Sequence, residues 1–100
     1  MGRVQIAMEQ RFGLAGVLAE HGVLLLRAEG AGAVRVLEAR LTDLPAVFDG
    51  LKSGERVVGE GPGWGIAILR EGAGLDIEIT GDAGAMRDAI AGLGTGFGGG

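Results

Sequence analysis

The chain has 100 residues, no cysteine and a formal net charge of −4. This length suits one domain with a single core, and the lack of cysteine excludes disulfide frameworks, cysteine-based zinc sites and thiol catalysis. Acidic and basic residues are interspersed without a basic stripe, which disfavours nucleic acid as a partner. Because no apolar run approaches the roughly 20 residues of a membrane span, we expect a cytoplasmic domain that binds no membrane.

Two stretches of the chain, residues 22–54 and 65–96, are similar to one another. Each contains an apolar run that ends in arginine, the tetrapeptide Glu-Gly-Ala-Gly, a β-branched run and the pattern Asp-x-x-Ala-apolar-x-Asp. Self-similarity of this kind is typical of a repeated structural unit. The sequence therefore predicts a single α+β domain over residues 1–93 with an internal pseudo-repeat, followed by a flexible glycine-rich tail over residues 94–100.

The first unit and the residues before it are expected to consist mainly of strands. Residues 3–8 alternate apolar and polar side chains, as a half-buried strand does. Residues 14–21 are ambiguous: by analogy with the second unit we expect a strand, and the alternative is a short helix that ends before Gly22. Residues 23–29 and 33–42 should form a hairpin around the glycines between them.

A helix is expected to follow each group of strands. In the first unit Asp43 is the candidate N-cap, and apolar residues recur at helical spacing until Gly54. The second unit is expected to contain strands over residues 55–60, 65–70 and 75–80. Asp82 is then expected to cap a helix that ends near Leu93. The sequence thus predicts antiparallel strands followed by a helix, a β-meander plus α twice, with the helices packed on one sheet face.

Both periodicities select the residues of one contiguous core. Those residues are Leu24, Leu26, Val34, Val36, Val47, Phe48, Leu51, Ile66, Ile68, Ile77, Ile79, Met86 and Ile90. Two strand-rich units also leave sheet edges with unpaired backbone groups, and the chain has one lysine to discourage edge pairing. We therefore expect a symmetric homodimer.

The succession of strands and then a helix, twice, resembles the PUR-type repeat of purine-rich-element-binding proteins. The resemblance is one of topology over most of the chain, and it implies a single-stranded nucleic-acid-binding protein. Its sheet face would have to gather Arg27, Arg35, Arg40, Arg56 and Arg70. That family's binding face is basic and aromatic, whereas this chain is acidic and has one tryptophan and three phenylalanines. We therefore rank this function second.

No residue pattern in the chain predicts catalysis. His21 is the only imidazole, and no cysteine or second histidine accompanies it as a metal ligand. Asp76 and Glu78 share one face of a predicted strand, where a solvated surface explains them. Asp43 and Asp82 are explained as helix caps. We expect a non-enzymatic protein with no catalytic residue, metal site or cofactor.

Trp64 is the best candidate for a functional residue, because it lies between two glycines in a predicted loop. Tryptophan leads the residue types that act as binding hot spots. With Pro62, which stiffens the turn, and Glu60, it forms the predicted partner-binding site. The leading hypothesis is a small interaction module of the inhibitor, immunity or antagonist type that binds another protein with a basic surface.

Overall fold

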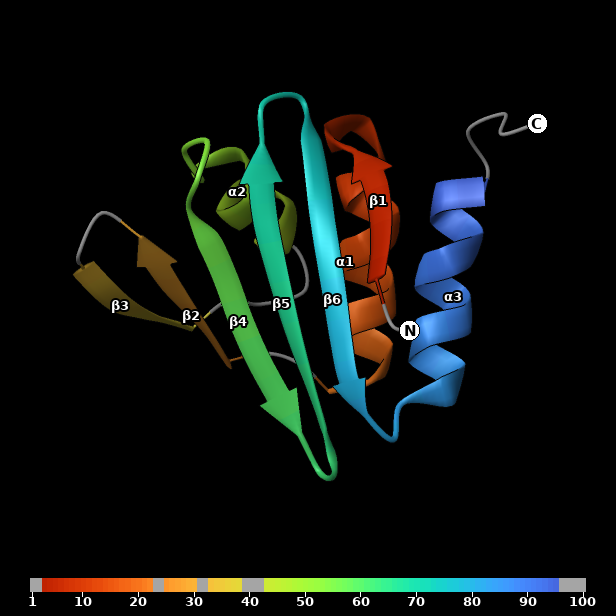
Figure 1. The fold of residues 1–100 in the computed structure, drawn as a ribbon. Helices are drawn as coiled ribbons and strands as arrows, with labels where there is room; N and C mark the ends of the chain where they lie inside the picture. The colour runs from red at the N-terminus through yellow and green to blue at the C-terminus, as the bar shows by residue number, and fades with distance from the viewer. Residues whose placement is uncertain (1–2, 23–24, 31–32, 39–42, 96–100) are drawn as a thin grey trace.

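The computed structural model describes residues 3–22, 25–30, 33–38 and 43–95. Its elements in chain order are β1 (Arg3–Ala7), a 3-10 turn (Met8–Gln10), α1 (Arg11–Glu20), β2 (Leu25–Gly30), β3 (Ala33–Glu38), α2 (Leu44–Asp49), β4 (Arg56–Gly61), β5 (Trp64–Glu71), β6 (Gly74–Gly81) and α3 (Gly84–Thr95). The strands form one antiparallel sheet in the order β1-β6-β5-β4-β2-β3 (Figure 1). The predicted α+β class is confirmed.

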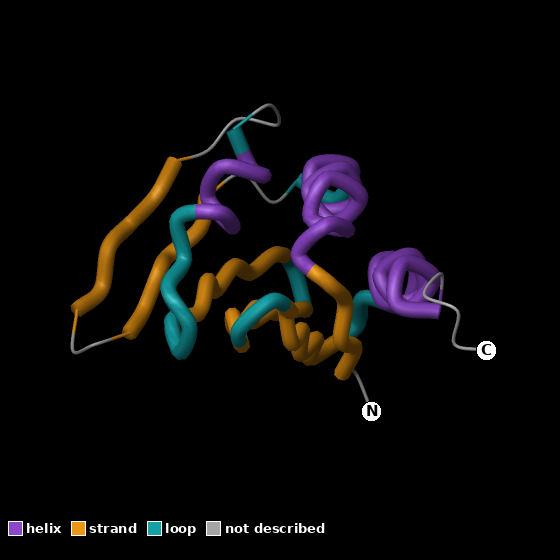
Figure 2. Tube along the Cα trace, turned by 90° about the horizontal axis from the view of Figure 1, so that it is seen from above, coloured by secondary structure: helices purple, strands orange, loops and turns teal. Residues whose placement is uncertain are grey.

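The three helices lie on the same side of the sheet, as Figure 2 shows. α1 packs between α2 and α3, and α3 also packs against the edge strand β1. The helices bury their apolar residues against one face of the central strands, where Ile66, Ile68 and Ile77 are 3% exposed or less. This two-layer arrangement leaves the other face of the sheet without a covering element among the described residues.

The expected strand over residues 14–21 is wrong, because residues 14–20 belong to the helix α1 and His21 is its C-cap. Leu14 and Leu18 lie four residues apart on one helix face, and both are fully buried. Gly22 follows the helix with a φ of 78°, a left-handed conformation that suits glycine after a helix C-terminus. The helical alternative is therefore correct, and burial of this face outweighs the helix-weakening effect of Gly16.

The predicted repeat of a β-meander plus α is not confirmed. The two similar stretches each cover a hairpin and a helix, but the units around them differ. Three consecutive strands, β4 to β6, precede α3, whereas the helix α1 interrupts the strands before α2. The helices differ as well, since α2 has 6 residues and α3 has 12. The homodimer that we expect from the sheet edges stays a prediction.

Most of the predicted core is confirmed. The buried members are Leu26, Phe48, Leu51, Ile66, Ile68, Ile77, Ile79, Met86 and Ile90, and Val47 packs against them half-buried. The side chains of Leu24, Val34 and Val36 lie outside the described residues. The prediction omits Leu14, Leu18, Leu44, Val57 and Leu75, which are also buried.

The two helix starts differ from their predicted capping. Asp43 occupies the N-cap position of α2, but its side chain makes no capping hydrogen bond. Asp82 lies two residues before the first residue of α3, and its backbone N–H donates to the carbonyl of Gly63 at 2.8 Å. Residues 94 and 95 of the predicted tail end α3, and residues 96–100 lie outside the described part of the chain.

Candidate functional site

The sheet face opposite the helices, called here the open face, is built from every second residue of the strands. Cross-strand pairing places these residues in rows. The first row is Glu60, Gly65 and Thr80, the second is Val58, Ala67 and Glu78, and the third is Arg56, Leu69, Asp76 and Gln5. The intervening residues of the same strands point to the helices, so each strand contributes to both faces.

A furrow follows β5 along the open face. Its floor is low at Gly65 and Ala67, because glycine and alanine have the smallest side chains, while β4 and β6 carry larger residues on either side. Two hollows of about 160 and 230 Å³ lie along it, and a third of about 390 Å³ lies beside it, between β1 and the β5–β6 hairpin. The two hollows on β5 share the wall residues Ala67 and Glu78, and Asp76 lines both the 160 Å³ hollow and the one beside β1. We call the whole feature the open-face furrow.

Carboxylates predominate around the open-face furrow, and Arg56 is the one cation that lines its described hollows. Glu60, Glu71 and Glu78 are exposed, and within the described residues their side chains form no hydrogen bond or ion pair. The β1 residue opposite Glu78 in the sheet register is Arg3. Because these three glutamates are exposed on the open face of β4 to β6, the local charge there is mainly negative and accessible to solvent.

The basic residues at the β2 side of the same face have an acidic partner. Arg56 binds Glu29 through Nη2 at 2.9 Å and Nε at 3.1 Å. Nε of Arg27 lies 3.5 Å from the same carboxylate. These ion pairs satisfy the Glu29 carboxylate and leave the acidic character of the furrow in place.

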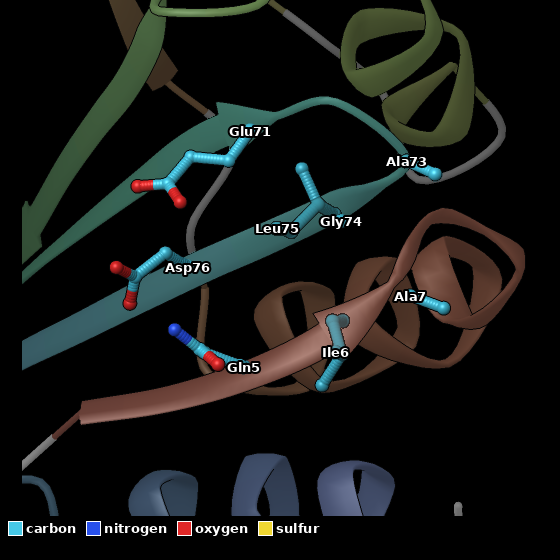
Figure 3. A pocket seen from close by; sticks show the side chains of 8 residues that line it. All are labelled: Gln5, Ile6, Ala7, Glu71, Ala73, Gly74, Leu75 and Asp76. Atoms are coloured by element: carbon cyan, nitrogen blue, oxygen red, sulfur yellow. The ribbon is translucent and has the colours of Figure 1, made fainter.

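The largest of these three hollows lies between β1 and the β5–β6 hairpin (Figure 3). Asp76 lines it and is only 7% exposed, although Glu78 and Thr80, which follow it on the same face of β6, are exposed. The side chains of Gln5 and Glu71 lie on the same side of the hairpin as Asp76, as Figure 3 shows. This hollow thus combines carboxylate and amide oxygens with the small residues Ala7 and Gly74.

Trp64 lies on the other face of the sheet from Glu60. It is the first residue of β5, not a loop residue, and its half-buried side chain packs against the core. The indole covers Gly61, its partner in β4, where a methyl group would collide with the ring. Pro62 is exposed in the turn between the two strands. The three predicted partner-binding residues therefore point in different directions, and their role stays a prediction.

Replacing Trp64 with alanine should lower the free energy of unfolding by about 2 kcal/mol, roughly half the cost of truncating a fully buried aromatic residue. The indole covers part of the core and fills the space above Gly61. Chemical denaturation of wild type and variant measures the difference. A loss below about 0.5 kcal/mol, the range of ordinary surface sites, would show that the indole does not contribute to packing.

Some of the arginines required for a PUR-like binding face point away from the open face or bind other groups of the protein. Arg70 points to the helix side, where Nη1 donates to the Leu51 carbonyl at 2.7 Å and Nε to the Gly72 carbonyl at 3.1 Å. Arg56 is held by Glu29, as described above. The side chains of Arg35 and Arg40 lie outside the described residues.

His21, the only imidazole of the chain, has a structural explanation. The Nδ1 atom of His21 lies 2.9 Å from the Val17 carbonyl at the end of α1. Within the described ranges, no group of three or more histidine, cysteine, aspartate or glutamate residues is arranged to hold a metal ion. In the same part of the chain, no helix has the length and apolar character needed to cross a bilayer.

Comparison with known proteins gives no assignment, since no family profile, curated protein or solved structure matches the chain. The open face is therefore the basis for any functional inference. The sequence predicted Glu60 as a partner-binding residue and placed Asp76 and Glu78 on one face of a strand. It missed the furrow, although the alternation of small Gly65 and Ala67 with large isoleucines along β5 was a visible signal for it.

Proposed function

We propose that this chain is a small, non-enzymatic protein-interaction module whose open face binds a basic surface of another protein. The observation that carries the proposal is the set of three exposed carboxylates, Glu60, Glu71 and Glu78, which have no partner within the described residues and surround the open-face furrow. Lysine or arginine side chains of a partner would complement them. Such complementarity mainly increases the association rate and the specificity.

The residues inside this acidic rim support the same proposal. Val58, Ala67 and Leu69 are half-buried at the centre of the open face, where a partner could cover them. An apolar centre with a charged rim is the usual composition of a protein–protein interface. Inhibitors, immunity proteins and antagonists of this size work by such surface recognition, which requires no catalytic group.

The alternative function, PUR-like binding of single-stranded nucleic acid, has less support. The carboxylates that favour a basic protein would repel phosphates at the same surface. Three of the five arginines that this function needs, Arg27, Arg56 and Arg70, already bind groups of the protein itself.

A binding experiment with two charged probes tests the proposal. Fluorescence anisotropy would measure binding of a labelled arginine- and lysine-rich peptide and of labelled oligothymidylate over a salt titration. The variant combines Glu60→Gln, Glu71→Gln and Glu78→Gln. The matched control combines Glu9→Gln, Glu20→Gln and Asp88→Asn, which removes three exposed acids elsewhere.

We expect the wild type and the control to bind the basic peptide, and the open-face variant to bind it about tenfold more weakly. This estimate assumes about 0.5 kcal/mol for each exposed ion pair. Equal weakening in variant and control would mean that net charge alone attracts the peptide, and the proposed site would be wrong. Binding of oligothymidylate in place of the peptide would favour the PUR-like function.

A further inference from the structure

The open-face furrow also indicates what kind of basic segment fits it. Resting on the proposed function, we infer that the partner presents an amphipathic α-helix with lysine or arginine along its flanks, and that this helix lies along β5. The argument uses the chemistry of a sheet face, the dimensions of the furrow and the distribution of charge around it.

A sheet face and a sheet edge select different partners. The backbone groups of β5 are already paired with β4 on one side and β6 on the other. An extended segment on this face would therefore contact side chains and could form no backbone hydrogen bonds with β5. Its own N–H and C=O groups would lose their hydrogen bonds to water and gain none in return. A helix satisfies these groups internally, so it can cover the face without that cost.

The dimensions of the open face along β5 agree with those of a helix. From β4 across β5 to β6 are two interstrand spacings, or about 10 Å, and a helix with its side chains is about 10–12 Å wide. The open-face positions of β5 run from Gly65 to Glu71, a length of about 20 Å in a strand. A helix of about 13 residues spans that length.

The distribution of charge determines the chemistry of that helix. Val58, Ala67 and Leu69 provide an apolar strip for its hydrophobic stripe. Glu60 lies on the β4 side of the furrow and Glu78 on the β6 side, so basic residues are needed on both flanks of the stripe. Lysine and arginine suit these positions because their stems cover apolar surface while their charged ends reach the carboxylates.

Two peptides of identical composition test this inference. Each has about 14 residues of leucine, alanine, lysine and arginine. One places the leucines at helical i, i+3, i+4, i+7 spacing with basic flanks, and the other has the same residues in an order without a helical stripe. Anisotropy measures affinity, and circular dichroism measures the helix content gained on binding.

Two single substitutions locate the site. Ala67→Arg places bulk and positive charge on the furrow floor, and Ala89→Arg makes the same change at an exposed position of α3. Thermal melts establish that each variant is folded. If Ala67→Arg does not fold, the pair Glu60→Gln and Glu78→Gln takes its place, since both residues are exposed.

We expect the helical peptide to bind about tenfold more tightly than its scrambled form and to gain helix on binding. Its affinity should fall about tenfold for the Ala67→Arg protein and stay unchanged for the Ala89→Arg protein. Equal affinities for both peptides would overturn the helix inference and leave the acidic open face as a binding surface. If neither peptide binds the folded wild type, both the inference and the proposed function are wrong.

Discussion

Replacing Phe48 with alanine is expected to lower the free energy of unfolding by about 3–5 kcal/mol. Phe48 is fully buried and is among the largest fully buried side chains in the described structure. It belongs to α2, which has 6 residues and is too short to be stable by its own hydrogen bonds. Loss of the ring would therefore leave a cavity and also weaken the packing of α2 against α1 and the rest of the core.

Chemical denaturation of wild type and the Phe48→Ala variant measures this loss. Val47→Ala is a suitable control, because the neighbouring valine is half-buried and should cost only about 1 kcal/mol. A loss of less than 1 kcal/mol for Phe48→Ala would mean that the inward face of α2 is assigned wrongly.

The substitution Leu18→Ala should cost about 2–5 kcal/mol, whereas Phe12→Ala in the same helix should change stability by about 1 kcal/mol or less. Leu18 is 0% exposed and Phe12 is 62% exposed. The interaction that Phe12 would lose is with the Arg11 guanidinium, which lies 4.5 Å from the ring centroid.

This pair of substitutions tests the main correction to the sequence interpretation, namely that residues 11–20 form a helix. A strand that extended back to residue 12 would place residues of equal parity on one face, so Leu14, Leu18 and also Phe12 would share an environment. Similar losses for Leu18→Ala and Phe12→Ala would therefore contradict the helix. Thermal and denaturant melts of the two variants give the comparison directly.

The sequence predicted most strands of the sheet because their alternation is clear. The segment around Ile77 and Ile79 alternates apolar and charged residues without interruption, and these residues form β6 as expected. For residues 14–21 the local pattern allowed a helix, but Gly16 weakens that signal and the analogy with the second unit favoured a strand; the helix α1 is stabilised by burial against α2 and α3. Such tertiary contacts are not visible in a window of ten residues.

The candidate site was predicted only in part for a related reason. Trp64 attracts attention in the sequence because glycines surround it, but the pairing of Gly61 with Trp64 places the indole on the helix side of the sheet. Glu60 and Glu78 come together through the pairing of β4, β5 and β6, which joins residues far apart in the chain. Their relation to the small residues Gly65 and Ala67 requires the strand register.

Mapping of the binding surface by NMR tests the central claim most directly. The isotopically labelled protein would be titrated with the basic helical peptide, and amide chemical-shift changes would be assigned to residues. We predict changes concentrated on β4, β5 and β6 around Val58, Ala67 and Glu78, with little change on the exposed side of α1. Changes confined to α1, or to the turn at Pro62, would contradict the assignment of the open face as the binding surface.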